Sequence, residues 1–247
     1  MMNYRKIKWM AIPLLVMFIV WWFASVWIYT RYPADRMNKL ESSMSTGAGY
    51  NYMKAQILFS MTFVVTLFQL LPELGIQDVI KRGRARWVFA RLRYIFVSAM
   101  YFSAIFILVE IALSIADIGI DFLIKYNYFH CMLLGWISLT FIYFFMGCLY
   151  LMFSVLFSAG LVALGASFIV SLVFMVASFY RNLPSVYAVM DVMQWPALEK
   201  MGMGRMMDIM FVAKPLIYNT VAMVAIIIVT IRVFKRKDLL DSRLQLI

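Results

Sequence analysis

The sequence alternates between long apolar runs and short segments that hold most of its charged residues. Six runs approach the roughly 20 residues that an α-helix needs to cross the hydrocarbon core of a bilayer. The stretch 126–180 holds no Asp, Glu, Lys or Arg over 55 residues, which is too long for one crossing and too short for three. We therefore place a turn at 154–160, where Ser and Gly cluster. The predicted spans are 10–29, 53–71, 94–116, 129–153, 160–180 and 215–233.

The composition favours one all-α, polytopic membrane domain over residues 1–247. Hydrophobic residues make up 65% and charged residues 14%, against roughly 45–50% and about 25% in soluble domains, which excludes a soluble globule. The net charge is +11, and most of the 23 Lys and Arg residues fall in 1–9, 72–93 and 232–247. The positive-inside rule then predicts a multi-pass protein of the cytoplasmic membrane with both termini in the cytoplasm. Because topology explains the basic charge, no nucleic-acid partner is predicted.

The segment 72–93 between the second and third predicted spans contains more than the basic residues that anchor a loop. It opens with acidic residues around a glycine, continues with an apolar side typical of a helix lying on the membrane face, and then becomes strongly basic. One interpretation is a topology-setting loop with incidental acids. The other, which we favour, is a docking helix for a cytoplasmic partner. Its candidate contact residues are Glu73, Gly75, Asp78 and Arg82.

This segment, the six-span pattern and the basic end after Phe234 together resemble the permease subunits of ABC-2 type ABC transporters. The resemblance is greatest to small permeases that export antimicrobial or amphipathic peptides, such as phenol-soluble modulin exporters. It implies a type V exporter-like architecture, a coupling segment at 72–93 and an outer re-entrant segment at 182–213. It also implies a separate ATPase subunit, with two permeases pairing with two ATPases. One departure is that nine residues precede the first predicted span, where many such permeases carry a long amphipathic helix.

The chain contains no G-x-x-x-x-G-K-[ST] phosphate loop, so it is not predicted to be an enzyme or to bind a cofactor itself. ATP and Mg would be bound by the partner subunit. Together with the 17% aromatic content, the resemblance predicts an exporter of hydrophobic or amphipathic cargo such as peptides. The alternative is a non-transporting scaffold or sensor that anchors a cytoplasmic partner.

The last outer segment is rich in methionine, with seven in 21 residues. Unbranched, polarizable methionines repack around varied apolar ligands, so they are candidates for a transport pathway or gate. They also suit the filling of an irregular hairpin, and both interpretations stay open. The candidate pathway residues are Met190, Met193, Met206 and Met210.

Glu110 is the one acidic residue well inside a predicted span. Placing a carboxylate in the membrane costs a few kcal/mol unless it is paired, neutral or hydrated. Ser103 and Ser114, seven residues before and four after, share its helix face. The residue is therefore either a contact in the transport pathway or a member of an interhelical polar pairing.

Catalytic and metal-binding chemistry is not predicted. His130 is the one histidine, which excludes sites that need two imidazoles. Gly165 and Ser167 match the G-x-S pattern of rhomboid proteases, but no histidine follows them to act as a base. The small residues from Gly160 onward are better explained by close packing of helices.

Overall fold

The computed structural model describes residues 4–24, 40, 49–71, 79, 83–157, 159–179, 189 and 209–236. Within these residues the chain is helical, with no strand, which confirms the all-α prediction for this part of the chain. The helices are α1 (Tyr4–Trp22), α4 (Gly49–Leu70), α6 (Arg84–Ile118), α7 (Ile120–Lys125), α8 (Tyr128–Phe157), α9 (Gly160–Phe179) and α11 (Ile209–Arg236).

Among the described residues, three helices are long and apolar enough to cross a bilayer, which indicates a membrane-embedded protein. They are α6, α8 and the part of α11 from Leu216 to Arg236. Shorter apolar stretches lie in α1 (Ile12–Trp22), α4 (Leu58–Leu70) and α9 (Gly160–Phe174). Each predicted span overlaps one of these six helices. The break between α8 and α9 falls at residues 158–159, inside the predicted turn.

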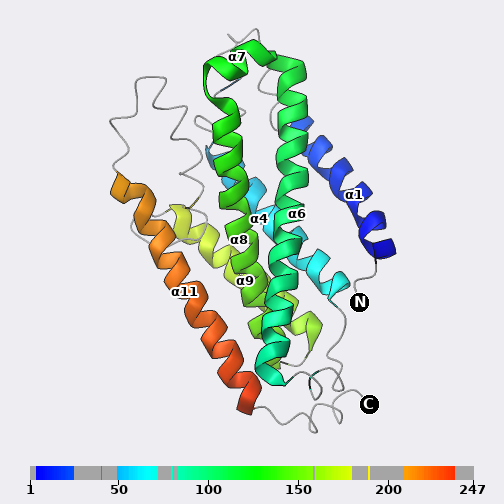
Figure 1. Ribbon diagram of the computed structural model, residues 1–247, viewed down its shortest axis with the longest axis vertical. Helices are drawn as coiled ribbons and strands as arrows, with labels where there is room; N and C mark the ends of the chain where they lie inside the picture. Colours follow the sequence, from blue (N-terminus) through cyan, green and yellow to red (C-terminus); the bar gives the residue numbers. More distant parts are fainter. Residues whose placement is uncertain are drawn as a thin grey trace.

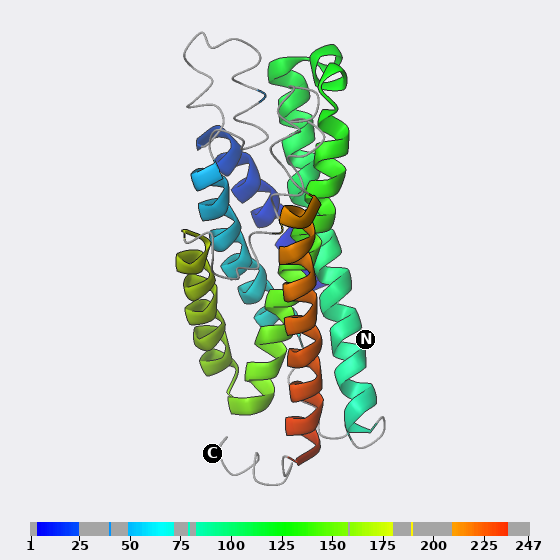
Figure 2. The same ribbon diagram turned by 90° about the vertical axis from the view of Figure 1, so that its left-hand side faces the viewer.

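The six long helices alternate in direction, as the colour gradient shows in Figures 1 and 2. The first residues of α1, α6 and α9 and the last residues of α4, α8 and α11 point toward the lower end of the molecule. Helix α8 is central, because it packs against α4, α6, α9 and α11. In the apolar stretch of α8, 61% of the residues are buried, compared with 11% in α11, which lies at the periphery.

Helices α6 and α8 form an antiparallel hairpin with α7 at its tip (Figure 1). Helix α6 ends at Gly119, which has φ +95°, a backbone conformation that glycine adopts without steric cost. After α7 the chain turns at Asn127, a left-handed residue with φ 56°, a region that Asn tolerates better than most residues. This hairpin sets the register between α6 and α8.

Helix α6 begins at Arg84, ten residues before the predicted third span. The second half of the segment 72–93 is therefore continuous with α6 and does not form a separate loop. Arginine is a good helix former, and its long apolar stem can lie along the bilayer edge while the guanidinium reaches water. A hydrophobic run locates the membrane, but a helix can extend beyond it.

Aromatic rings connect α1, α4, α6 and α8. Phe18 of α1 contacts Phe59 of α4 and Phe102 and Phe106 of α6, with ring centroids 5.0 to 5.4 Å apart. Edge-to-face pairs of this kind contribute about 0.5–1.5 kcal/mol beyond the burial of their area. They hold α1 against the rest of the bundle.

Two glycines mark close approaches between helices. A Cβ at Gly147 of α8 would overlap Cγ2 of Ile95 and lie 3.2 Å from Cδ1 of Leu67. A Cβ at Gly160 would lie 2.7 Å from the Phe68 ring of α4. Gly165 differs, because no heavy atom lies within 4 Å of its Cβ position, so close packing does not explain that glycine.

Candidate functional site

The beginning of α6 packs against the end of α11, at the lower end of the molecule in Figure 1. Nη1 of Arg84 donates to the carbonyl of Phe234 at 3.1 Å and also to the carbonyl of Lys235. The last four carbonyls of a helix have no partner within it and carry its partial negative charge. The Arg84 guanidinium therefore caps α11 from a helix 150 residues earlier in the chain.

Aromatic packing extends this contact. The rings of Trp87 and Phe234 are 5.1 Å apart, and the two side chains are only 5% and 1% exposed. The Arg91 guanidinium lies 4.9 Å from the centre of the Trp87 ring, within the range of a cation–π interaction. We call the set of Arg84, Trp87, Arg91, Phe234 and Lys235 the α6–α11 contact.

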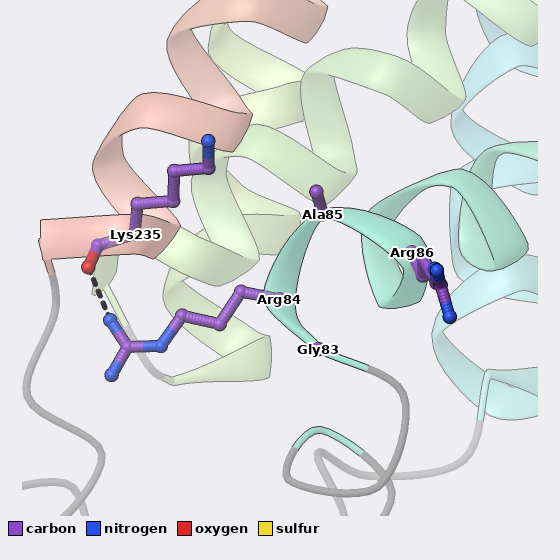
Figure 3. Close-up of a pocket in the computed structure, with 5 residues that line it drawn as sticks. All are labelled: Gly83, Arg84, Ala85, Arg86 and Lys235. Carbon is purple, nitrogen blue, oxygen red and sulfur yellow. Dashed lines mark hydrogen bonds between the residues drawn. The ribbon is translucent and has the colours of Figure 1, made fainter.

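An open groove of about 520 Å³ lies beside the α6–α11 contact. It is lined by Gly83, Arg84, Ala85, Arg86 and Lys235. Figure 3 shows Arg84 reaching to the backbone carbonyl of Lys235, with Arg86 on the other side of the first turn of α6. Arg86 and Lys235 are exposed, so their charged groups face the surroundings of the protein.

Charge is strongly polarised along the described helices. The acidic residues of the described segments are Glu110, Asp117 and Asp121, all in the last third of α6 or in α7. The opposite end carries a cluster of basic residues from the first turns of α6 and the last turns of α11. These are Arg84, Arg86, Arg91, Arg93, Arg232, Lys235 and Arg236.

A polar seam joins α6 to α8 inside the bundle. The hydroxyls of Ser103 and Thr140 are 2.7 Å apart, and the Tyr128 hydroxyl donates to Oγ of Ser114 at 2.9 Å. Nε1 of Trp136 donates to the carbonyl of Met100 at 3.2 Å. These bonds satisfy buried polar groups across an interface that is otherwise apolar.

Glu110 lies on α6 between the two seam serines and is 6% exposed. Ser103 and Ser114 are both fully buried, so the face predicted from the helical period is the face that packs against α8. This surrounding favours the interhelical interpretation of Glu110. A role in the transport pathway stays a prediction.

The other predicted site residues lie mostly outside the described residues, and their arrangement stays a prediction. This applies to Glu73, Gly75, Asp78 and Arg82 of the coupling segment and to Met190, Met193 and Met206. Met210 lies in the first turn of α11, and its side chain is outside the described part. Within the coupling segment, Val79 is described and is 2% exposed.

Sequence reasoning did not find the partnership between Arg84 and α11. Part of this contact is visible in the sequence. A tryptophan lies within the basic start of one helix, and a phenylalanine precedes Lys235 at the end of another. Two such rings can bury each other. Residues 150 positions apart, however, give no periodic pattern that pairs them.

Comparison with known proteins gives no match: no family model, no curated protein and no solved structure is significantly similar to the chain. The structure by itself defines the chain as a helical membrane protein whose longest helices meet at a basic end.

Proposed function

We propose that this protein is the membrane subunit of an ATP-driven exporter of hydrophobic or amphipathic cargo such as peptides. The observation that carries the proposal is that the basic second half of the predicted coupling segment, residues 84–93, belongs to α6. A force applied to the first turn of α6 by a soluble partner reaches the bundle through an unbroken helix. The alternation of six long helices and the resemblance to ABC-2 permeases support the same class.

The energy for transport comes from a separate ATPase in this proposal, since the chain contains no phosphate loop. Closure of two ATPase subunits on ATP displaces the coupling segment and with it the lower end of α6. Transport requires that the cargo bind the inward and outward states with different affinities, because a ligand with equal affinity for both shifts neither. Alternating access of a permease dimer in the cytoplasmic membrane follows from this scheme.

A scaffold or sensor that anchors a cytoplasmic partner is the second candidate. The exposed basic residues at the ends of α6 and α11 favour it, because they present a charged surface without requiring a pathway. The two functions differ in one respect. A transporter couples cargo to ATP hydrolysis, whereas a scaffold does not.

Reconstitution with its ATPase tests the proposal. The tagged chain, purified in mild detergent from its native host, should bring down an ATPase in equal stoichiometry. In proteoliposomes, ATP hydrolysis should rise when amphipathic helical peptides are added, and the chain alone should hydrolyse no ATP. Peptides that leave hydrolysis unchanged, in a complex that does contain an ATPase, would favour the scaffold.

Charge reversal in the coupling segment locates the contact. Glu73→Lys should abolish peptide-stimulated hydrolysis while leaving membrane insertion intact, and Asp78→Lys should have a smaller effect. Reversing a buried interfacial charge costs several kcal/mol, but an exposed one costs less than about 1 kcal/mol. Lys125→Glu, at the opposite end of the molecule, is the control. Stimulation equal to wild type in both coupling variants would restrict the segment to a topological role.

A further inference from the structure

The groove beside the α6–α11 contact lies where two membrane-crossing helices end. Helices α6 and α11 both qualify as spans by length and composition, and both carry their basic residues at this end. Exposed apolar side chains follow directly on the same helices, with Phe89 58% and Val229 44% exposed. The groove is therefore at the level where lipid headgroups meet acyl chains.

We propose that this groove, lined by Arg84, Arg86 and Lys235, binds the headgroup of an anionic phospholipid. The inference goes beyond the proposed function and rests only on the protein being embedded in a membrane. Three cationic side chains from two helices line one open space, and the acidic residues of the described segments all lie toward the other end of α6 or in α7. Basic pockets between membrane helices on the cytoplasmic side suit phosphate-bearing headgroups.

Arg84 has a different role from its neighbours in this site. Its Nη1 is bound to the carbonyls of Phe234 and Lys235, so it fixes the two helix ends that line the groove relative to each other. Arg86 and Lys235 are exposed and lie on opposite sides of the first turn of α6, and the Arg86 side chain points away from Lys235 (Figure 3). Their flexible stems let both charges approach one headgroup from either side.

A lipid fits the surroundings better than a soluble anion. Among the described residues the groove is open rather than enclosed, so it would hold a small phosphate weakly. The exposed faces of Phe89 and Phe96 on α6 and of Ile228 and Val229 on α11 offer apolar surface to the acyl chains. The basic residues would attract the headgroup, and the apolar side chains would bury the acyl chains. The two interactions together bind the lipid stably, whereas each one alone is weak.

The experiment counts lipids bound to the purified full chain by native mass spectrometry during titration with phosphatidylglycerol or phosphatidylcholine. The variant Arg86→Gln/Lys235→Gln removes two charges from the groove. Each basic residue near an anionic lipid surface contributes about 1 kcal/mol, or about fivefold in affinity. We expect phosphatidylglycerol binding to weaken roughly 25-fold and the weak phosphatidylcholine binding to stay unchanged.

Two double variants with the same loss of charge are the controls. Arg93→Gln/Arg236→Gln removes exposed charges at the same end outside the groove, and Lys125→Gln/Lys214→Gln removes charges from the tip and from the start of α11. Both should lower phosphatidylglycerol affinity by less than about threefold, since surface charges away from the site are screened. If the groove variant does not fold, Lys235→Gln alone should still show the fivefold loss.

Three results would overturn the proposal. Equal losses in the groove variant and in Arg93→Gln/Arg236→Gln would mean diffuse attraction to the whole basic end. Equal affinity of the wild type for both lipids would mean that charge does not select the ligand. Displacement of phosphatidylglycerol by an equal concentration of glycerol phosphate would assign the groove to a soluble phosphate compound.

Discussion

Single residues determine how closely the helices of this bundle approach one another. At Gly147 the absence of a side chain lets α8 lie directly on Ile95 of α6 and Leu67 of α4, both of which are fully buried. Atoms in such an interior have little freedom to move, since protein interiors are packed as densely as organic crystals. Gly165 of α9 faces open space and has no such constraint.

We expect Gly147→Ala to lower the stability of the protein by about 1–3 kcal/mol, the usual cost of overpacking, despite the higher helix propensity of Ala. The measurement is the midpoint of thermal unfolding in detergent. Gly165→Ala is the matched control and should leave the midpoint unchanged or raise it. A Gly147→Ala midpoint at or above that of the control would contradict the close approach.

Glu110 is tested by a pair of substitutions. Glu110→Gln keeps a hydrogen-bonding side chain of the same shape, so if Glu110 is a neutral or paired structural group, the stability of the variant should match that of the wild type. Glu110→Ala removes every polar atom and leaves a cavity, and we expect a loss of about 1–3 kcal/mol. Thermal unfolding and reconstituted transport are both measured. Transport that fails in a stable, ATPase-bound Glu110→Gln protein would assign the charge to the transport pathway.

At the scale of elements, the polar seam and the α6–α11 contact connect α6 to two different partners. The seam holds α6 to α8 through Ser103 and Ser114, which both bond across the interface. The α6–α11 contact is made at the other end, by one arginine and a pair of aromatic rings. Helix α11 is otherwise largely exposed, so this contact is important for keeping its end in place.

We expect Arg84→Ala to loosen the last turn of α11. Loss of its hydrogen bonds to the carbonyls of Phe234 and Lys235 should raise amide hydrogen exchange in residues 232–236 about tenfold, which corresponds to about 1.4 kcal/mol of local stability. Arg86→Ala is the control, because Arg86 starts the same helix and is exposed. Equal exchange in the two variants would show that the capping by Arg84 contributes nothing.

Sequence patterns predict where the helices lie and which faces they bury, but not where each helix begins or which distant residues pair. Apolar runs locate the helices, and the helical period places Ser103, Glu110 and Ser114 on one face, because burial in a helix follows a local repeat. The start of α6 is misplaced by ten residues, since hydrophobicity marks the bilayer and the helix extends into its basic flank. The pairing of Arg84 with α11 is not predictable from one sequence, because it depends on how distant helices pack. Residues 72–78 and most of 180–208, which hold further predicted site residues, lie outside the described part.

At the scale of the whole molecule, the distribution of charge and the directions of the helices together predict one orientation of the protein in the membrane. The basic ends of α6 and α11 lie together, and α7 with its exposed Lys125 lies at the opposite end (Figure 1). The positive-inside rule predicts that the basic end lies in the cytoplasm and α7 outside.

Cysteine labelling in intact cells checks this orientation. A membrane-impermeant maleimide should label Lys125→Cys from outside and should label Arg236→Cys only after the membrane is opened. The native cysteines Cys131 and Cys148 are both buried, so the wild type should give little background. Labelling of Arg236→Cys in intact cells would reverse the orientation and place the basic groove outside.

Helix α6 is longer than the hydrocarbon core of a bilayer is thick. Its 35 residues span about 52 Å, whereas the hydrocarbon core is about 30 Å thick. A tilt within the usual range, up to about 40°, does not accommodate this difference, so the ends project beyond the hydrocarbon core. No glycine or proline interrupts the helix before Gly119, so its sequence provides no hinge between Arg84 and Ile118. A rod that pivots at the polar seam behaves as a seesaw: an inward swing of its arginine end moves the α7 end outward. In such a pivot, one hinge-free helix would reverse the direction of a movement between its two ends.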